Sequence, residues 1–126
     1  EDSGFDTLAN AFGVYFHNMT LLPAFPFDRL VMAIGQLDLR MNIAAVRPVD
    51  AARQLRQPML AIIGTADRTV PPPEGMALFR AAAGPKQLLL IPGAGHVAGY
   101  QTARGVYERT VLTFLQHAIP TWSAAA

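Results

Sequence analysis

The apolar positions of this chain follow two different periods. Between residues 5 and 22 they recur at helical spacing, as in Leu8, Phe12 and Phe16, whereas residues 59–63 form a continuous apolar run. Helical spacing predicts an amphipathic helix, and a short apolar run bounded by proline and glycine predicts a strand buried on both faces. We therefore predict helices over residues 5–22, 27–41, 48–56, 74–83 and 102–118, and strands over residues 59–63 and 87–91.

The order of these elements indicates an α/β fold. Residues 58–119 read strand, helix, strand, helix, which predicts two parallel strands joined by a right-handed crossover and flanked by helices. Residues 1–57 form a helical segment, and we interpret residues 1–126 as a single partial domain. In the last helix the apolar residues on or near one stripe are Val106, Val111, Leu112, Phe114 and Leu115.

Composition narrows the function classes. The chain has 126 residues, 52% of them hydrophobic, a formal net charge of +1 and no cysteine. Its basic residues form no run, which argues against nucleic acid as a partner, and no apolar stretch is long enough to cross a membrane. The lack of cysteine excludes disulfides and thiolate metal sites. We expect neither a metal nor a cofactor, and we take the cytoplasm as the default compartment.

Two polar residues follow the two predicted strands directly. Asp67 ends the segment PMLAIIGTAD, and His96 stands in the glycine-rich turn PGAGHVAGY, 29 positions later. In a parallel sheet, reacting groups gather at the carboxyl ends of the strands. A short carboxylate fixed at a strand end orients an imidazole and stabilises its protonated form, which is the acid–base part of a nucleophile–histidine–acid triad. Asp67 and His96 are therefore the candidate catalytic residues.

Each candidate also has a simpler interpretation. Asp67 lies in turn chemistry and could cap the turn, and His96 could be a loop histidine bonded to the backbone. The turn at residues 93–99 has glycines between a strand and a helix, as a dinucleotide-binding fingerprint does, but its spacing is one residue too long. His17 and His117 lie in helices, and we assign them no catalytic role. Their spacing to other polar residues indicates no metal site.

These segments resemble the C-terminal part of an α/β-hydrolase fold enzyme of the serine esterase, lipase and prolyl-peptidase-like branch. The resemblance rests on GTAD before Val70-Pro71 and on PGAGH after the second strand, and it extends over residues 3–115. It implies that Asp67 is the triad acid and His96 the base. The nucleophile elbow G-x-S-x-G of this family is absent, and neither Ser3 nor Ser123 stands in such a context.

The resemblance implies that this chain is the C-terminal portion of a serine hydrolase acting on ester or amide bonds. The N-terminal strands of the sheet and the nucleophile would lie outside it, and the start of the chain reads as a cut edge. Its partners would be a small-molecule or peptide acyl substrate and the missing N-terminal portion. The alternative is a non-catalytic binding or scaffold module. In both cases we expect an open outer edge on strand 59–63, through which the isolated chain would self-associate.

Overall fold

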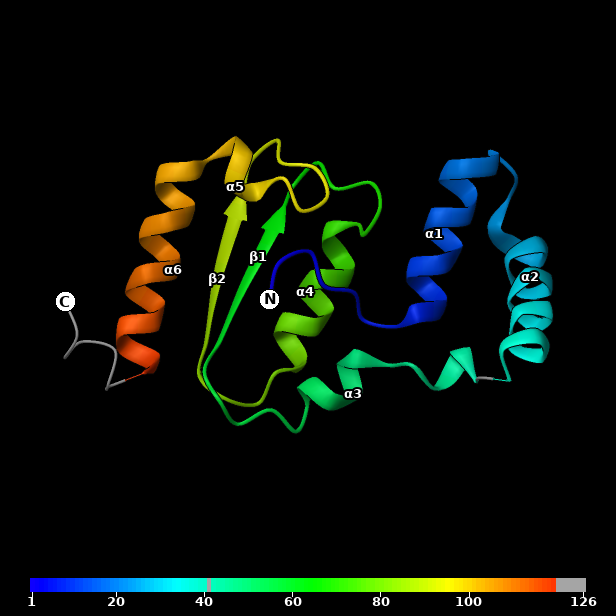
Figure 1. Cartoon of the computed structure of the whole chain (residues 1–126), viewed down its shortest axis with the longest axis horizontal. Coiled ribbons are helices and arrows are strands. Elements are labelled where there is room, and N and C mark those ends of the chain that lie inside the picture. Colours follow the sequence, from blue (N-terminus) through cyan, green and yellow to red (C-terminus); the bar gives the residue numbers. More distant parts are fainter. Residues whose placement is uncertain (41, 120–126) are drawn as a thin grey trace.

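The computed structural model describes residues 1–40 and 42–119 (Figure 1). Its elements in chain order are α1 (Leu8–Thr20), α2 (Ala24–Leu39), the short 3-10 helix η1 (Ile43–Ala45), α3 (Pro48–Ala52), β1 (Met59–Gly64), α4 (Pro72–Ala81), β2 (Lys86–Ile91), α5 (Gly99–Thr102) and α6 (Arg104–Ala118). The predicted element types are confirmed. The boundaries differ: α2 begins before Pro26, α3 is shorter than predicted, and the last helix is divided at Ala103.

The two strands are parallel, as predicted, with Met59 opposite Lys86 and Gly64 opposite Ile91. All six residues of β1 are buried, which confirms the expectation that this strand is covered on both faces. β2 has a similarly apolar sequence, but only Ile91 is buried, and Leu90 is 48% exposed. The difference arises because β1 has neighbours on both of its edges, whereas β2 pairs only with β1 among the described residues.

Helices cover the two faces of this strand pair (Figure 1). Alternate side chains of a strand point to opposite faces. Leu60 and Ile62 pack with Tyr107, Val111 and Phe114 of α6. On the other face, Met59 and Ala61 pack with Phe79 and Ala82 in and after α4. The stripe predicted for the last helix is partly wrong, because Val106 and Leu112 are exposed and Tyr107 takes their place in the core.

The outer edge of β1 is not bare, contrary to our expectation. The N-terminal residues lie along it, and Asp2 forms a parallel bridge with Ile62. The Ile62 amide donates to the carbonyl of Glu1 at 2.9 Å, and its carbonyl accepts from the Ser3 amide at 3.1 Å. These bonds satisfy backbone groups in the centre of β1. They also bring residues 1–3 to the same sheet as Asp67 and His96.

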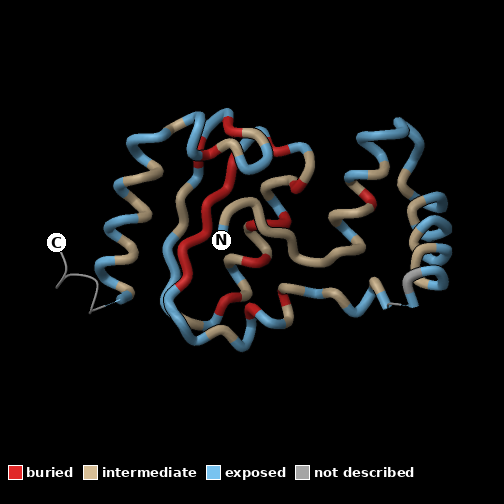
Figure 2. The backbone as a smooth tube through the Cα atoms, in the orientation of Figure 1, coloured by how far each residue is buried: buried red, intermediate tan, exposed pale blue. Residues whose placement is uncertain are grey.

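Helices α1 and α2 form a hairpin that lies away from the sheet (Figure 1). Figure 2 shows the contrast in burial: red is concentrated in β1 and the segments around it, whereas α2 is tan and pale blue. Gly13 is the one buried residue of α1, and no residue of α2 whose burial is described is buried. One stripe of α2 is apolar and exposed: Phe27, Leu30, Val31, Ile34 and Leu37.

Candidate active site

Asp67 is held in a fixed orientation just beyond β1. Its side chain is 2% exposed. One carboxylate oxygen, Oδ1, accepts the backbone N–H groups of Thr69 and Val70, both at 2.9 Å. These bonds are the local turn chemistry that we weighed as the simpler interpretation. They use only one of the two oxygens, however, and leave Oδ2 for another partner.

The partner of Oδ2 is His96. The Nδ1 atom of His96 lies 2.9 Å from Asp67 Oδ2. The approach expected for these two side chains, 29 residues apart, is therefore confirmed. Among the described residues, no protein group is hydrogen-bonded to the other ring nitrogen, Nε2. The His96 side chain is 38% exposed, so this nitrogen is accessible to a bound molecule.

The two turns that carry these residues are joined by backbone hydrogen bonds. The Thr65 amide donates to the Ile91 carbonyl at 3.1 Å, and the Ala66 amide to the Ala94 carbonyl at 2.9 Å. Gly64 makes this close approach feasible, because a Cβ atom there would lie 2.4 Å from the Ala94 oxygen. The glycine-rich turn therefore fixes the acid–base pair by packing directly on the β1 turn.

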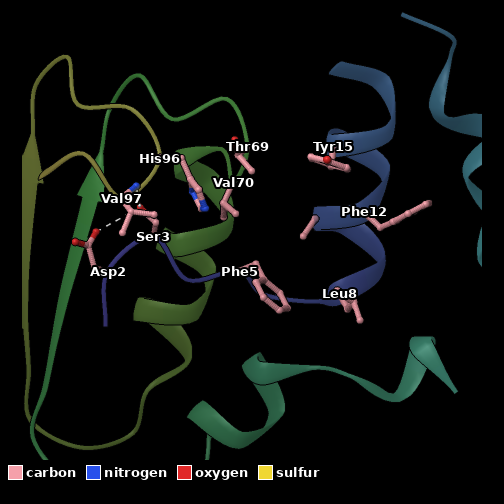
Figure 3. Close-up of a pocket in the computed structure, with 11 residues that line it drawn as sticks. Asp2, Ser3, Phe5, Leu8, Phe12, Tyr15, Thr69, Val70, His96 and Val97 are labelled. Carbon is pink, nitrogen blue, oxygen red and sulfur yellow. Dashed lines mark hydrogen bonds between the residues drawn. The ribbon is translucent and has the colours of Figure 1, made fainter. Parts of the chain in front are cut away.

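A pocket of about 400 Å³ lies in front of His96, between its turn and helix α1 (Figure 3). Figure 3 shows the His96 ring between Ser3 and Val70, on the part of its turn nearest α1, with Tyr15 across the gap and Phe12 projecting from the far side of the helix. Most of the lining side chains are apolar. The full lining is Asp2, Ser3, Phe5, Leu8, Ala11, Phe12, Tyr15, Thr69, Val70, His96 and Val97. Helix α1 is thus part of the site, although most of its residues are far from the sheet.

Ser3 is a site residue for which the sequence contains no clear signal. Its backbone has a φ of +57°, and its hydroxyl accepts the N–H of Val97 at 3.1 Å. The same hydroxyl donates to Asp2 Oδ1 at 3.3 Å. Ser3 therefore connects the N-terminal segment to the His96 turn. No hydrogen bond joins Ser3 to His96 among the described residues, and its hydroxyl is already engaged.

Glu74 is the second residue that sequence reasoning missed. It is 9% exposed in the first turn of α4, and its Oε2 atom is buried without a hydrogen-bond partner among the described residues. Burial, reinforced by the negative charges of Asp6 and Asp67, raises the pKa of Glu74 to about 7. In the sequence it reads as an ordinary acidic residue at a helix N-terminus, where negative charge is favourable. Only the fold reveals its surroundings.

The remaining histidines have no place in the site. His17 Nδ1 lies 2.7 Å from the carbonyl of Leu22, and His117 Nδ1 lies 2.7 Å from the carbonyl of Thr113. Within the part of the chain that the structure describes, no three His, Asp or Glu side chains gather as metal ligands would. None of the described helices combines the length and apolarity needed to cross a bilayer. Ser123 lies outside the described residues.

Residues 5–121 match the prolyl oligopeptidase family of peptidases. The chain belongs to this family. Among solved structures it is similar to BpoC of Mycobacterium tuberculosis, a protein that carries the name of a non-heme bromoperoxidase, with 27% identity and a TM-score of 0.52. The match covers 59% of this chain and 26% of BpoC, so the chain spans about a quarter of that protein's length. A search of curated proteins finds no match. The α/β-hydrolase fold class expected from the sequence is confirmed.

Proposed function

We propose that this chain supplies the acid, Asp67, and the base, His96, of a serine hydrolase acting on ester or amide bonds. The observation that carries the proposal is the 2.9 Å contact between His96 Nδ1 and Asp67 Oδ2, with Asp67 Oδ1 held by two backbone N–H groups. This arrangement fixes the ring so that Nδ1 carries the proton and Nε2 is free to accept one. The nucleophile would come from a segment outside this chain.

In this proposal His96 moves the proton and Asp67 stays ionised. His96 Nε2 removes the proton from the attacking serine hydroxyl, and the serine oxygen adds to the substrate carbonyl. The imidazolium that forms is stabilised by the buried carboxylate of Asp67. His96 then gives the same proton to the leaving oxygen or nitrogen as the acyl bond breaks. A water molecule is activated by His96 in the same way to release the acyl group.

The pocket in front of His96 favours a substrate that carries an apolar group. Its lining, which includes Phe5, Phe12 and Val70, offers few polar partners. Burying an apolar group there gains about 25 cal/mol per Å² of surface removed from water. Family membership further supports a peptide or related acyl compound as the substrate class.

The alternative is a non-catalytic binding module that keeps the hydrolase-like strand pair. The engaged hydroxyl of Ser3 favours it for the isolated chain, because Ser3 is the only serine among the described residues. The two functions differ in whether a nucleophile outside the chain completes the site. They therefore make opposite predictions about a protein that contains the missing hydrolase part.

The test compares the isolated chain with the same chain joined to its upstream coding region, using p-nitrophenyl acyl esters. We expect the isolated chain to hydrolyse no faster than free imidazole, and the longer protein to turn over. There, His96→Ala and Asp67→Asn should each lower kcat by about 10⁴- to 10⁶-fold, by analogy with other triads. The exposed His17→Ala is the matched control and should have little effect.

Two results would contradict the proposal. Undiminished activity of His96→Ala in the longer protein would remove its base. A burst of product from the isolated chain that disappears in Ser3→Ala would show that Ser3 is the nucleophile. An upstream region without G-x-S-x-G and without activity would favour the binding module.

A further inference from the structure

A second hollow continues the pocket beyond Tyr15. It measures about 380 Å³ and is lined by Tyr15, Asn18, Met19, Leu21, Arg68 and Thr69. Tyr15 and Thr69 also line the pocket in front of His96. The two hollows therefore share one wall, made by a side chain of α1 and one from the Asp67 turn. We call them the His96 hollow and the Arg68 hollow.

The two hollows differ in charge. The acidic residue in the lining of the His96 hollow is Asp2. Its two oxygens accept from Ser3 Oγ at 3.3 Å and from Tyr107 Oη at 3.1 Å, and in Figure 3 its carboxylate lies on the far side of Ser3 from His96. The lining of the Arg68 hollow includes one basic residue, Arg68, and no acidic residue. Arg68 takes part in none of the ion pairs of the described residues. The basic residue of the groove thus lies at the end beyond Tyr15, away from His96.

Helix α1 is attached to the Asp67 turn at this point. The Asn18 side-chain amide donates to the carbonyl of Arg68. This bond links the helix that carries Tyr15 to the residue directly after the candidate acid. Thr69 of the dividing wall and the backbone of Arg68 therefore belong to the same turn as Asp67, and Asn18 ties that turn to the helix of Tyr15. A ligand that spans both hollows would contact His96 at one end and Arg68 at the other.

We propose that the groove selects acyl compounds with an apolar body and an anionic group remote from the reacting carbonyl. The lining of the His96 hollow is mostly apolar and suits the apolar body, and Arg68 attracts an anion beyond Tyr15, because opposite charges attract. Arg68 and Tyr15 are then specificity-determining residues. That the reacting carbonyl lies at His96 rests on the proposed function. That the groove has two parts does not depend on the proposed function.

The test is a binding measurement on the chain itself, which needs no nucleophile. The probes are 6-phenylhexanoate and its neutral amide, 6-phenylhexanamide, with dissociation constants measured by NMR titration at pH 7.5. An exposed ion pair contributes about 0.2–1 kcal/mol, so we expect the carboxylate to bind about 1.4- to 5-fold more tightly. Arg68→Gln should remove this preference. Arg56→Gln, an exposed arginine that precedes β1 at the opposite end of the strand, should retain it.

A second variant tests the wall. Tyr15→Ala opens the two hollows to each other, and we expect it to shift the best-binding phenylalkanoate to a different chain length. His17→Ala, on the same helix but in the lining of neither hollow, should not. Equal binding of acid and amide, or no binding of either, would overturn the proposal. A carboxylate preference that survives Arg68→Gln and disappears in His96→Gln would place the anion at His96 and overturn it too. Binding as expected without esterase activity in the longer protein would refute the proposed function alone.

Discussion

Strand β1 and helix α2 are both strongly apolar, but they meet opposite environments. Every apolar residue of β1 is at most 8% exposed, whereas the apolar stripe of α2 is 42–82% exposed. The strand lies between α6 and α4 and beside β2, all of which come from the same 60-residue stretch of chain. The stripe of α2 points away from α1, the helix it contacts most. An apolar segment is buried only where other segments pack against it. The segments that pack on β1 lie close to it in the sequence, whereas the apolar stripe of α2 stays exposed.

The largest effect should come from a matched pair of isoleucines. Ile62 of β1 is 3% exposed and Ile34 of α2 is 58% exposed. Ile62→Ala leaves a cavity in a packed core, and we expect it to lower the free energy of unfolding by about 2–5 kcal/mol. Ile34→Ala should change it by about 0.5 kcal/mol or less. Urea denaturation of both variants checks this, and equal losses would show that α2 is buried in solution.

Glu74 should make the stability of the β1–α4 region depend on pH. Its pKa is raised from 4.5 to about 7, so the folded state disfavours the ionised form. Protonated Glu74 therefore contributes to the free energy of unfolding. This contribution is fully present below pH 4.5, is lost as the pH rises through about 7, and amounts to at most about 3 kcal/mol. Glu74→Gln cannot ionise. We therefore expect its melting temperature to exceed that of the parent chain at pH 8 but not at pH 4.5.

The control for this experiment is Glu108→Gln. The Glu108 side chain is 43% exposed and hydrogen-bonded to Arg104, which lowers the pKa of Glu108. Its removal should not raise stability at pH 8. If Glu74→Gln and the parent chain show the same pH dependence, then Oε2 has a partner in solution that offsets its burial.

The smallest effect concerns association. We expect the isolated chain to associate into dimers or larger species at high concentration, because apolar surface on α2 is exposed to water. Light scattering measures the associated fraction. The paired edge of β1 makes a strand-to-strand contact there less favourable than the sequence suggests. Leu37→Lys should then lower the associated fraction, whereas Leu90→Lys on β2 should not. If Leu90→Lys lowers the associated fraction and Leu37→Lys does not, the chains associate through the sheet edge instead.

The sequence predicts best what depends on neighbouring residues. The parallel order of β1 and β2 and the approach of Asp67 to His96 follow from short segments whose partners lie within one crossover. The pairing of Asp2 with Ile62 spans the whole helical hairpin, and two polar residues at a terminus carry no strand pattern. The burial of Glu74 cannot be predicted from the sequence either, since it results from packing of α4 against β1 and the N-terminal segment.

The contact between Ser3 and Val97 has a consequence for the order in which the site assembles. The acid–base pair closes a loop of 29 residues, whereas the Ser3–Val97 hydrogen bond closes one of 94. Loop-closure entropy grows with the logarithm of length, so the longer loop costs about 1 kcal/mol more. Contacts between residues distant in sequence also form later in folding. During synthesis or refolding, Asp67 and His96 should come into contact first. The N-terminal segment that carries Ser3 should pack against the His96 turn last and so complete the pocket.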